Sequence, residues 1–247
     1  IDSVKKKSAE LAMLPVENST YGRVADIHSL LPDSGLNIVK EHFLRVRINL
    51  LGLPGSKLTD IKKAVSHTVL LGQCQDFLTK NEIKSIAGPD TAGSARSVSE
   101  LKDTCTAALA SSLAAEIYGL ETIAEHIEDM KNNTTRFLIM SQKKQLESAI
   151  FDKSKAMTTL VFQVRNIPAA LYKALGGFAT NGINMLKLES YMIGGSFTAT
   201  QFYLDIEGHP ETDAVSRALD ELRYFTSKYN VLGVYEKHPF RSNINPK

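Results

Sequence analysis

The sequence lacks the features expected of a secreted, membrane-spanning or nucleic-acid-binding protein. It has two cysteines in 247 residues, and we expect Cys74 and Cys105 to be reduced core residues because neither has a partner at metal-ligand spacing. No apolar run reaches about 18 residues, and the first ten residues contain no signal-peptide core. The charges nearly cancel, with 29 Lys and Arg against 27 Asp and Glu. We therefore expect a cytoplasmic protein with no nucleic-acid or membrane partner.

Up to about residue 142, short apolar runs alternate with helical periods, which predicts an α/β layered domain over 1–142. Buried strands are expected at 11–16 and 137–140, and one Ala-rich helix is expected from Cys105 to a left-handed cap at Gly119. The first strand has no preceding strand to pair with, so we expect that a segment upstream of residue 1 is missing. Residues 143–156 are polar and aperiodic, which indicates a linker.

A second pattern follows over 157–240. Strands are expected at 160–164, 183–193, 196–206 and 231–235, with a turn at Gly194-Gly195. One helix begins at Pro168, and another carries apolar residues from Val215 to Phe225. Within the third strand, alternate residues from Phe202 to Ile206 share one face. The βαββαβ order predicts a ferredoxin-like domain, with 241–247 as a tail.

Four short motifs and one longer stretch carry a family resemblance. The motifs LPVENSTYGRV (14–24), SHTVLLGQC (66–74), GPDTAGSA (88–95) and TRF (135–137) resemble those of prephenate dehydratase in order and spacing. Residues 167–190 resemble the ACT regulatory domain of monofunctional enzymes of that family. The resemblance implies a two-lobed, periplasmic-binding-protein-like catalytic region with its active site in the cleft between the lobes. It also implies conversion of prephenate to phenylpyruvate, carbon dioxide and water in phenylalanine biosynthesis.

This chemistry needs positioning and preorganised donors, so no nucleophile, metal or cofactor is expected. Thr135 matches the threonine of the TRF motif, and we expect its hydroxyl to hydrogen-bond the departing hydroxyl, with Thr134 as the rival. Arg136 is either a ligand of a substrate carboxylate or a structural clamp, because adjacent strand residues face opposite ways. Further residues are expected at the substrate site or its wall: Asn18, Ser19, Ser66, Gln73, Thr91 and Phe137.

Some of these residues have a plain structural alternative. Pro15 is expected to end its strand, which places Asn18 at a strand-to-helix junction where it either binds an anion or caps the helix. Asp90 is expected to cap a helix whose first turn contains Thr91. Glu17 would repel a dianion unless it is protonated or turned away. His67 ranks below Thr135 as an acid because it has no visible partner.

The ACT-like stretch implies a phenylalanine site, usually formed between two subunits. We therefore expect phenylalanine as an effector and a homodimer or homotetramer. Expected effector-site residues are Ala169, Ala170, Leu171, Asn181, Leu188, Glu189 and Ser190. Ala169 stands where Gly is usual, and Tyr191-Met192 replaces the usual Arg-Pro, so inhibition, activation and response to another amino acid stay open. Arogenate dehydratase and a non-catalytic amino-acid-sensing module are the alternative functions.

Overall fold

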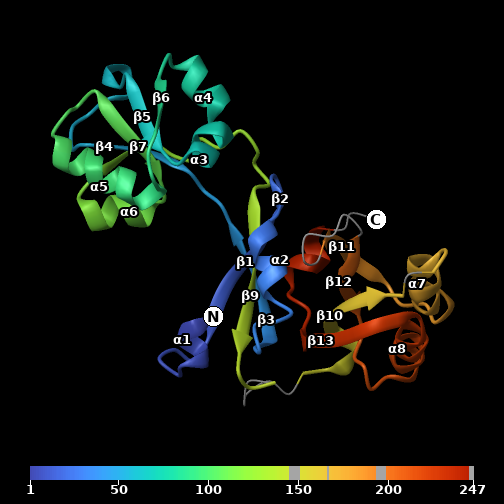
Figure 1. Cartoon of the computed structure of the whole chain (residues 1–247). Coiled ribbons are helices and arrows are strands. Elements are labelled where there is room, and N and C mark those ends of the chain that lie inside the picture. Colours follow the sequence, from blue (N-terminus) through green and yellow to red (C-terminus); the bar gives the residue numbers. More distant parts are fainter. Residues whose placement is uncertain (145–150, 166, 193–198, 245–247) are drawn as a thin grey trace. The chain divides into compact units, whose positions relative to one another are not determined.

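The computed structural model describes residues 1–144, 151–165, 167–192 and 199–244, and contacts divide the chain into two compact units (Figure 1). One unit is Arg45–Thr134; the other joins Ile1–Leu44 to Thr135–Lys247. The mixed α/β class is confirmed, whereas the periplasmic-binding-protein-like description and the boundaries at 142 and 157 stay predictions. The expected turn at Gly194-Gly195 and part of the expected linker lie outside the described residues.

The unit Arg45–Thr134 has three layers, with helices on both faces of one sheet. Its five strands lie in the order β6-β5-β7-β4-β8. The strands are β4 (Asn49–Gly52), β5 (Lys63–Ser66), β6 (Lys84–Ala87), β7 (Thr106–Ala110) and β8 (Glu121–Ala124). The helices are α3 (Thr68–Gln73), α4 (Gln75–Lys80), α5 (Thr91–Leu101) and α6 (Ser112–Tyr118), and the 3-10 turn η1 (Leu58–Asp60) precedes β5. On β7, Ala107 and Leu109 join the core under α3 and α4, whereas Ala108 and Ala110 join the core under α5 and α6.

The prediction of one helix from Cys105 to Gly119 is wrong for its first half. Thr106–Ala110 is the middle strand of the sheet, and all five of its residues are buried. A strand covered on both faces has an unbroken apolar run, so its Ala-rich sequence does not alternate, and tertiary packing overrides helix propensity. The end of α6 is confirmed, since Gly119 has φ 65° at the cap. Cys74 is buried as expected, but Cys105 is exposed.

The other unit contains one eight-stranded sheet in the order β11-β12-β10-β13-β3-β9-β1-β2. Its N-terminal strands are β1 (Ala12–Asn18), β2 (Gly22–Arg23), β3 (Asn37–Arg45) and β9 (Thr134–Ser141). The later strands are β10 (Ala156–Val164), β11 (Met185–Met192), β12 (Ala199–Glu207) and β13 (Thr226–Glu236). The helices are α1 (Asp2–Lys5), α2 (Ala25–Leu30), α7 (Ala170–Thr180), α8 (Asp213–Phe225) and α9 (Phe240–Ile244), with a 3-10 turn η2 (Lys153–Lys155).

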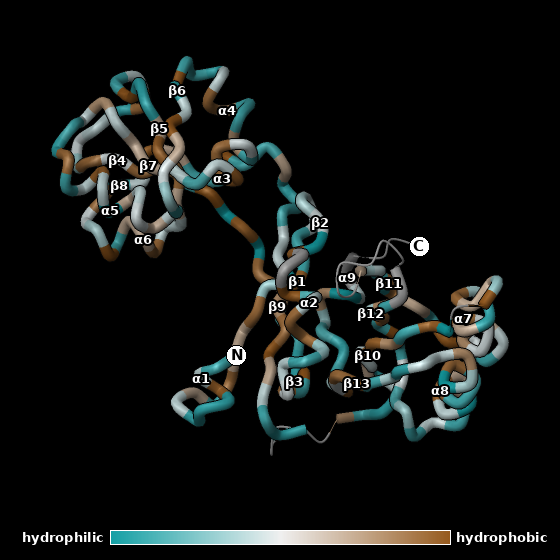
Figure 2. Tube along the Cα trace, in the orientation of Figure 1, coloured by the Kyte–Doolittle hydropathy of each residue, from teal (hydrophilic) through white to brown (hydrophobic). Residues whose placement is uncertain are grey.

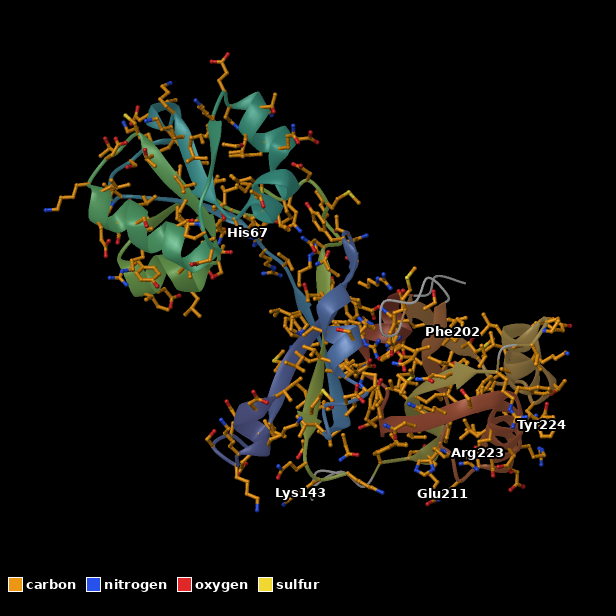
Figure 3. All side chains as sticks on the ribbon, in the orientation of Figure 1. His67, Lys143, Phe202, Glu211, Arg223 and Tyr224 are labelled. Carbon is orange, nitrogen blue, oxygen red and sulfur yellow. The ribbon has the colours of Figure 1, made fainter. Side chains whose placement is uncertain are left out.

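The βαββαβ prediction is confirmed for residues 156–236, here called the ferredoxin-like half. Elements β10, α7, β11, β12, α8 and β13 follow in chain order, and their strands lie as β11-β12-β10-β13. The alternate residues Phe202, Leu204 and Ile206 face a core that also contains α7 and α8 residues. In Figure 3, Phe202 lies among the elements of this half and Tyr224 on the outside of α8, where it is 69% exposed. Apolar segments of the strands appear brown in Figure 2.

The opposite face of the ferredoxin-like half is also buried. Met157, Val161 and Tyr203 pack in one core with residues of the N-terminal strands, including Ile38 and Leu138. At the join of the two parts of the sheet, Gly233 of β13 lies opposite Ile38 of β3 in parallel register. A Cβ at Gly233 would lie 2.1 Å from the Ile38 carbonyl oxygen. This close approach requires glycine.

Strand β1 differs from its prediction at both ends. Leu11 and Met13 are 43% and 48% exposed, although Val16 is fully buried. Pro15 does not end the strand; it pairs with Phe137, and a register shift follows. The strand continues to Asn18 and turns into β2, so Asn18 lies in a hairpin instead of at a helix start. Proline is tolerated here because β2 pairs only with Glu17 and Asn18.

Candidate active site

Asn18 and Thr135 form the centre of the candidate site. They lie opposite each other on β1 and β9, and the Asn18 Nδ2 donates a hydrogen bond to Thr135 Oγ1 at 3.1 Å. Asn18 Oδ1 accepts from the backbone N–H groups of Thr20 (2.9 Å) and Tyr21 (3.0 Å). These N–H groups determine which end of the amide faces Thr135. The Thr135 hydroxyl therefore acts as an acceptor here, and its own proton can serve a second acceptor.

The structure separates Thr135 from its rival Thr134. The Thr134 side chain is buried, and its hydroxyl donates to the Asn132 carbonyl at 3.3 Å. Thr135 is only partly buried. Ser19 is exposed in the turn that Asn18 closes, and Phe137 is partly buried beside Pro15. The geometry thus favours Thr135 as the hydroxyl that reaches a substrate.

Arg136 is buried among acidic side chains, with 1% of its surface exposed. Its Nε donates to Glu41 at 2.9 Å, and its Nη1 donates to Glu17 at 3.0 Å and to Asp205 at 2.6 Å. Its Nη2 donates to the Tyr235 hydroxyl at 2.9 Å. Every guanidinium nitrogen has a protein partner, so the geometry favours Arg136 as a structural clamp. Binding of a substrate carboxylate by Arg136 stays a prediction.

The clamp joins the N-terminal strands to the ferredoxin-like half, because Asp205 belongs to β12 and Glu17 to β1. Burial raises the pKa of Asp205, but the Arg136 guanidinium and the Thr159 hydroxyl outweigh it and hold that pKa below its ordinary value. The pKa of Glu17 is likewise lowered, since Arg136 and Lys187 outweigh the effect of burial. Glu17 is thus paired with two cations, Arg136 and Lys187, which offset the repulsion that its charge would exert on a dianion.

In the unit Arg45–Thr134, Ser66 and Thr91 come to one edge of the sheet. Ser66 ends β5 opposite Ala87, the last residue of β6, and Thr91 begins the helix that follows β6. The Ser66 hydroxyl is fully buried and donates to the Leu109 carbonyl at 2.8 Å. Asp90 is confirmed as the cap of α5, because its carboxylate accepts from the Gly93 N–H at 2.5 Å. Ser66 is thus held by the backbone in this structure.

Gln73 and His67 lie at opposite ends of α3. Gln73 ends that helix, is 8% exposed, and its side-chain oxygen accepts no hydrogen bond from the described residues. His67 is the N-cap, and its Nδ1 accepts from the Val69 N–H at 3.3 Å (Figure 3). Capping explains His67 without an acid role, whereas the Gln73 amide has unused capacity.

The expected effector-site residues are spread over the ferredoxin-like half. Ala169 precedes α7 with φ 57°, a left-handed conformation that favours glycine, so the departure from Gly falls where the backbone is strained. Ala170 is buried and Leu171 packs against the core. Asn181 follows the other end of α7, roughly 18 Å along the helix axis from Ala169. These two ends of α7 do not form one site within a single chain.

Strand β11 carries the remaining expected effector-site residues, and two of these contact Arg23 of β2. Leu188 is 41% exposed. Glu189 lies 3.7 Å from both Lys187 Nζ and Arg23 Nη1, and the Ser190 carbonyl accepts from Arg23 at 3.1 Å. The expected effector strand thus touches the β1–β2 hairpin that holds Asn18.

Sequence reasoning missed the partners of Arg136. Glu41 and Asp205 have no exposed surface. Glu41 gave no signal of a buried charge, because it lies between Lys40 and His42. For Asp205 the available signal was a carboxylate between Leu204 and Ile206, since an isolated buried carboxylate is costly and requires a cation. The position of that cation depended on pairing between distant segments.

Within the described ranges, no group of three or more His, Cys, Asp or Glu side chains could hold a metal. No helix among those residues is long and apolar enough to span a membrane. The expectations of no metal and no cofactor stay predictions.

Comparison with known proteins identifies relatives over nearly the whole chain. Residues 1–145 match the family model of prephenate dehydratase. A Komagataeibacter europaeus protein, a bifunctional N-acyl-homoserine lactone acylase/prephenate dehydratase, is 50% identical over 98% of this chain and 85% of its own length. Arogenate dehydratase/prephenate dehydratase 1 of Arabidopsis thaliana is 37% identical over 91% of this chain. This chain spans 60% of the length of that plant protein.

Two solved structures resemble this one along the chain. One, described as GqqA, a novel type of quorum-quenching acylase, has a TM-score of 0.88 at 50% identity and covers 97% of this chain and 86% of its own. The other is prephenate dehydratase from Arthrobacter aurescens in complex with L-Phe, with a TM-score of 0.83 at 28% identity. It covers 100% of this chain and 80% of its own.

Proposed function

Since the chain belongs to the prephenate dehydratase family, we propose that it converts prephenate to phenylpyruvate, carbon dioxide and water in phenylalanine biosynthesis. In this reaction the bond to the ring carboxylate breaks, and its electron pair enters the ring as carbon dioxide leaves. The ring hydroxyl departs with one proton as water. The ring becomes aromatic, so the driving force lies in the substrate, and the protein supplies alignment and hydrogen-bond donors.

The observation that carries this proposal is the hydrogen bond from Asn18 to Thr135 at 3.1 Å. Because the Thr135 oxygen accepts from Asn18, its proton is directed to another acceptor, which in our proposal is the departing hydroxyl of the substrate. A positioned proton donor contributes a factor on the order of 10²–10⁴ in rate. Asn18, Ser19, Ser66, Gln73, Thr91 and Phe137 remain proposed substrate-site residues, and Arg136 is proposed as their structural clamp.

We also propose that the ferredoxin-like half is an ACT regulatory domain in a homodimer or homotetramer, with phenylalanine as its effector. Support comes from its strand order and from the relative solved in complex with L-Phe. Because Ala169 and Tyr191-Met192 depart from the usual motif, a titration with phenylalanine and with other amino acids decides between inhibition, activation and response to another amino acid.

The test compares turnover of prephenate by the whole chain with that of Thr135→Val and Thr135→Ser. Val keeps the branched shape of Thr but removes the hydroxyl, whereas Ser keeps the hydroxyl. We expect kcat to fall roughly 10²–10⁴-fold in Thr135→Val and to be largely retained in Thr135→Ser, with unchanged circular dichroism. No turnover by the wild type would reject the enzyme assignment, and near-wild-type kcat in Thr135→Val would remove Thr135 from its role.

Two further substrates are favoured by specific relatives. Arogenate, with an amino group in place of the keto oxygen, is favoured by the 37% identical plant protein. An N-acyl-homoserine lactone is favoured by the 50% identical relative from Komagataeibacter europaeus, a bifunctional N-acyl-homoserine lactone acylase/prephenate dehydratase. Assays with each substrate, with and without phenylalanine, rank the three activities. Phenylalanine binding without turnover of any of them would instead support the amino-acid-sensing module.

A further inference from the structure

The two residues next to the Asn18–Thr135 pair form a charge cluster with the ferredoxin-like half. Glu17 and Arg136 face each other in register on β1 and β9, 3.0 Å apart between Glu17 Oε1 and Arg136 Nη1. The second carboxylate oxygen of Glu17 accepts from the ammonium group of Lys187 on β11. The Lys187 side chain is 11% exposed and that of Glu17 28% exposed, so this contact is partly shielded from water and salt.

Through the contact between Glu17 and Lys187, β11 reaches the strand that carries Asn18. A register shift between Met185 and Lys187 on β11 brings Lys187 opposite Asp205, another of the three acids that bind Arg136. One cation on β11 thus completes a cluster of alternating charges around the end of β1. Burying an acid beside the site requires such compensation.

We propose that Lys187 is a positioning residue for the dehydratase reaction, holding Glu17 so that the neighbouring Asn18 keeps the Thr135 hydroxyl aligned. Lys187 acts through Glu17 and does not touch the substrate. This inference rests on the proposed function, since it assigns Lys187 to the same site.

The same contact couples a movement of β11 to the candidate active site. Lys187 lies directly before Leu188, Glu189 and Ser190, the proposed effector residues. Arg23, at the far end of the hairpin, binds the next part of the strand through Glu189 and the Ser190 carbonyl. A ligand that displaces β11 therefore displaces two anchors of the hairpin that contains Asn18.

The test uses the full chain and three variants. Lys187→Met removes the charge, Lys187→Arg retains it, and Lys153→Met is the control. Lys153, in the turn η2 that precedes β10, pairs with Glu211 of the ferredoxin-like half at 2.6 Å, but both side chains are exposed, at 57% and 68%. The control therefore removes an equivalent lysine–glutamate pair that lies on the surface.

We expect kcat to fall about 10–100-fold in Lys187→Met, because a misplacement on the order of 1 Å costs about 10²-fold, and KM to rise by a smaller factor. Lys187→Arg recovers most of the loss, and Lys153→Met leaves kcat and KM unchanged. Phenylalanine alters turnover of the wild type but not of Lys187→Met. Unchanged kcat in Lys187→Met, or an equal loss in Lys153→Met, would overturn the proposal.

Hydrogen exchange supplies a readout that does not depend on turnover. We expect faster exchange of the Thr20 and Tyr21 amides in Lys187→Met, since Asn18 binds both, and unchanged exchange over the core of α8. Faster exchange throughout the chain would indicate general unfolding and reject a positioning role. If the wild type turns over neither prephenate nor arogenate, the proposed function fails, while the exchange of the hairpin still decides whether Lys187 holds it.

Discussion

Replacing Arg136 by methionine tests whether the buried clamp stabilises the protein. Methionine retains much of the length and apolar volume of the side chain but removes its charge. Glu41 keeps a partner in the variant, because Arg241 donates to its two oxygens at 2.8 and 2.9 Å. Asp205 keeps the Thr159 hydroxyl, at 2.5 Å, but loses its cation. The largest loss is therefore expected at Asp205, which has no exposed surface.

The magnitude follows from this burial. Removing one partner of a buried ion pair costs roughly 3–5 kcal/mol, because the remaining charge stays desolvated. Proteins of this size are stable by about 5–15 kcal/mol, so the loss is a large part of the total. At about 2–4 °C for each kcal/mol, we expect the Tm to fall by roughly 6–20 °C.

The stability lost in Arg136→Met should depend on pH in a definite direction. In the wild type the pKa of Asp205 is lowered, so its stabilising effect is present above its unfolded pKa of about 3.9 and is lost as pH falls through the folded value. In Arg136→Met, burial without the cation raises that pKa above its unfolded value. As pH falls, protonation of Asp205 therefore removes the cost of burying its charge in the variant. The difference in unfolding free energy between wild type and variant should narrow from pH 7 toward pH 4.

The assay is urea unfolding followed by circular dichroism at pH 7 and pH 5. Arg96→Met is the control, because Arg96 binds Glu100 at 2.8 Å with side chains 66% and 62% exposed. We expect no measurable change in that variant, since exposed pairs contribute little. The clamp would be refuted if the urea midpoint of Arg136→Met equalled that of the wild type. It would also be refuted if the difference in unfolding free energy between the two proteins widened toward acid pH. A raised KM at unchanged stability would instead restore Arg136 as a substrate ligand.

Two further predictions follow from packing. Gly233→Ala places a Cβ 2.1 Å from a carbonyl oxygen of β3 and should lower the free energy of unfolding by about 3 kcal/mol. In Gly176→Ala the new Cβ has no neighbour within 4 Å, so the free energy of unfolding should rise by about 0.5–1 kcal/mol. Urea unfolding measures both changes. A thiol reagent should modify the exposed Cys105 in the native protein and Cys74 only after denaturation, because Cys74 is buried and burial raises its pKa to about 12. Reaction of both thiols at the same rate in the native state would contradict this packing.

Local patterns in the sequence predicted the elements whose apolar residues recur at a regular period. The helix α8 has one apolar stripe, and Phe202, Leu204 and Ile206 alternate along β12, and the structure places both sets in one core as expected. Gly119 and Asp90 were predictable because helix caps depend on residues close in sequence. By the same rule, β7 was mistaken for helix, since a strand buried on both faces has no alternation.

The sequence by itself determined the family, the βαββαβ order and Thr135 as the candidate catalytic residue, because motifs and periodicity are local. Only the tertiary structure decided what Thr135 and Arg136 contact. Asn18 binds Thr135 across 117 residues of chain, and Lys187 reaches Glu17 across 170. Such contacts depend on strand register and on the order of strands in the sheet, and a shift of one residue would turn each side chain to the other face. Pairing between distant strands, which no local pattern encodes, therefore made Arg136 a clamp and placed β11 beside the site.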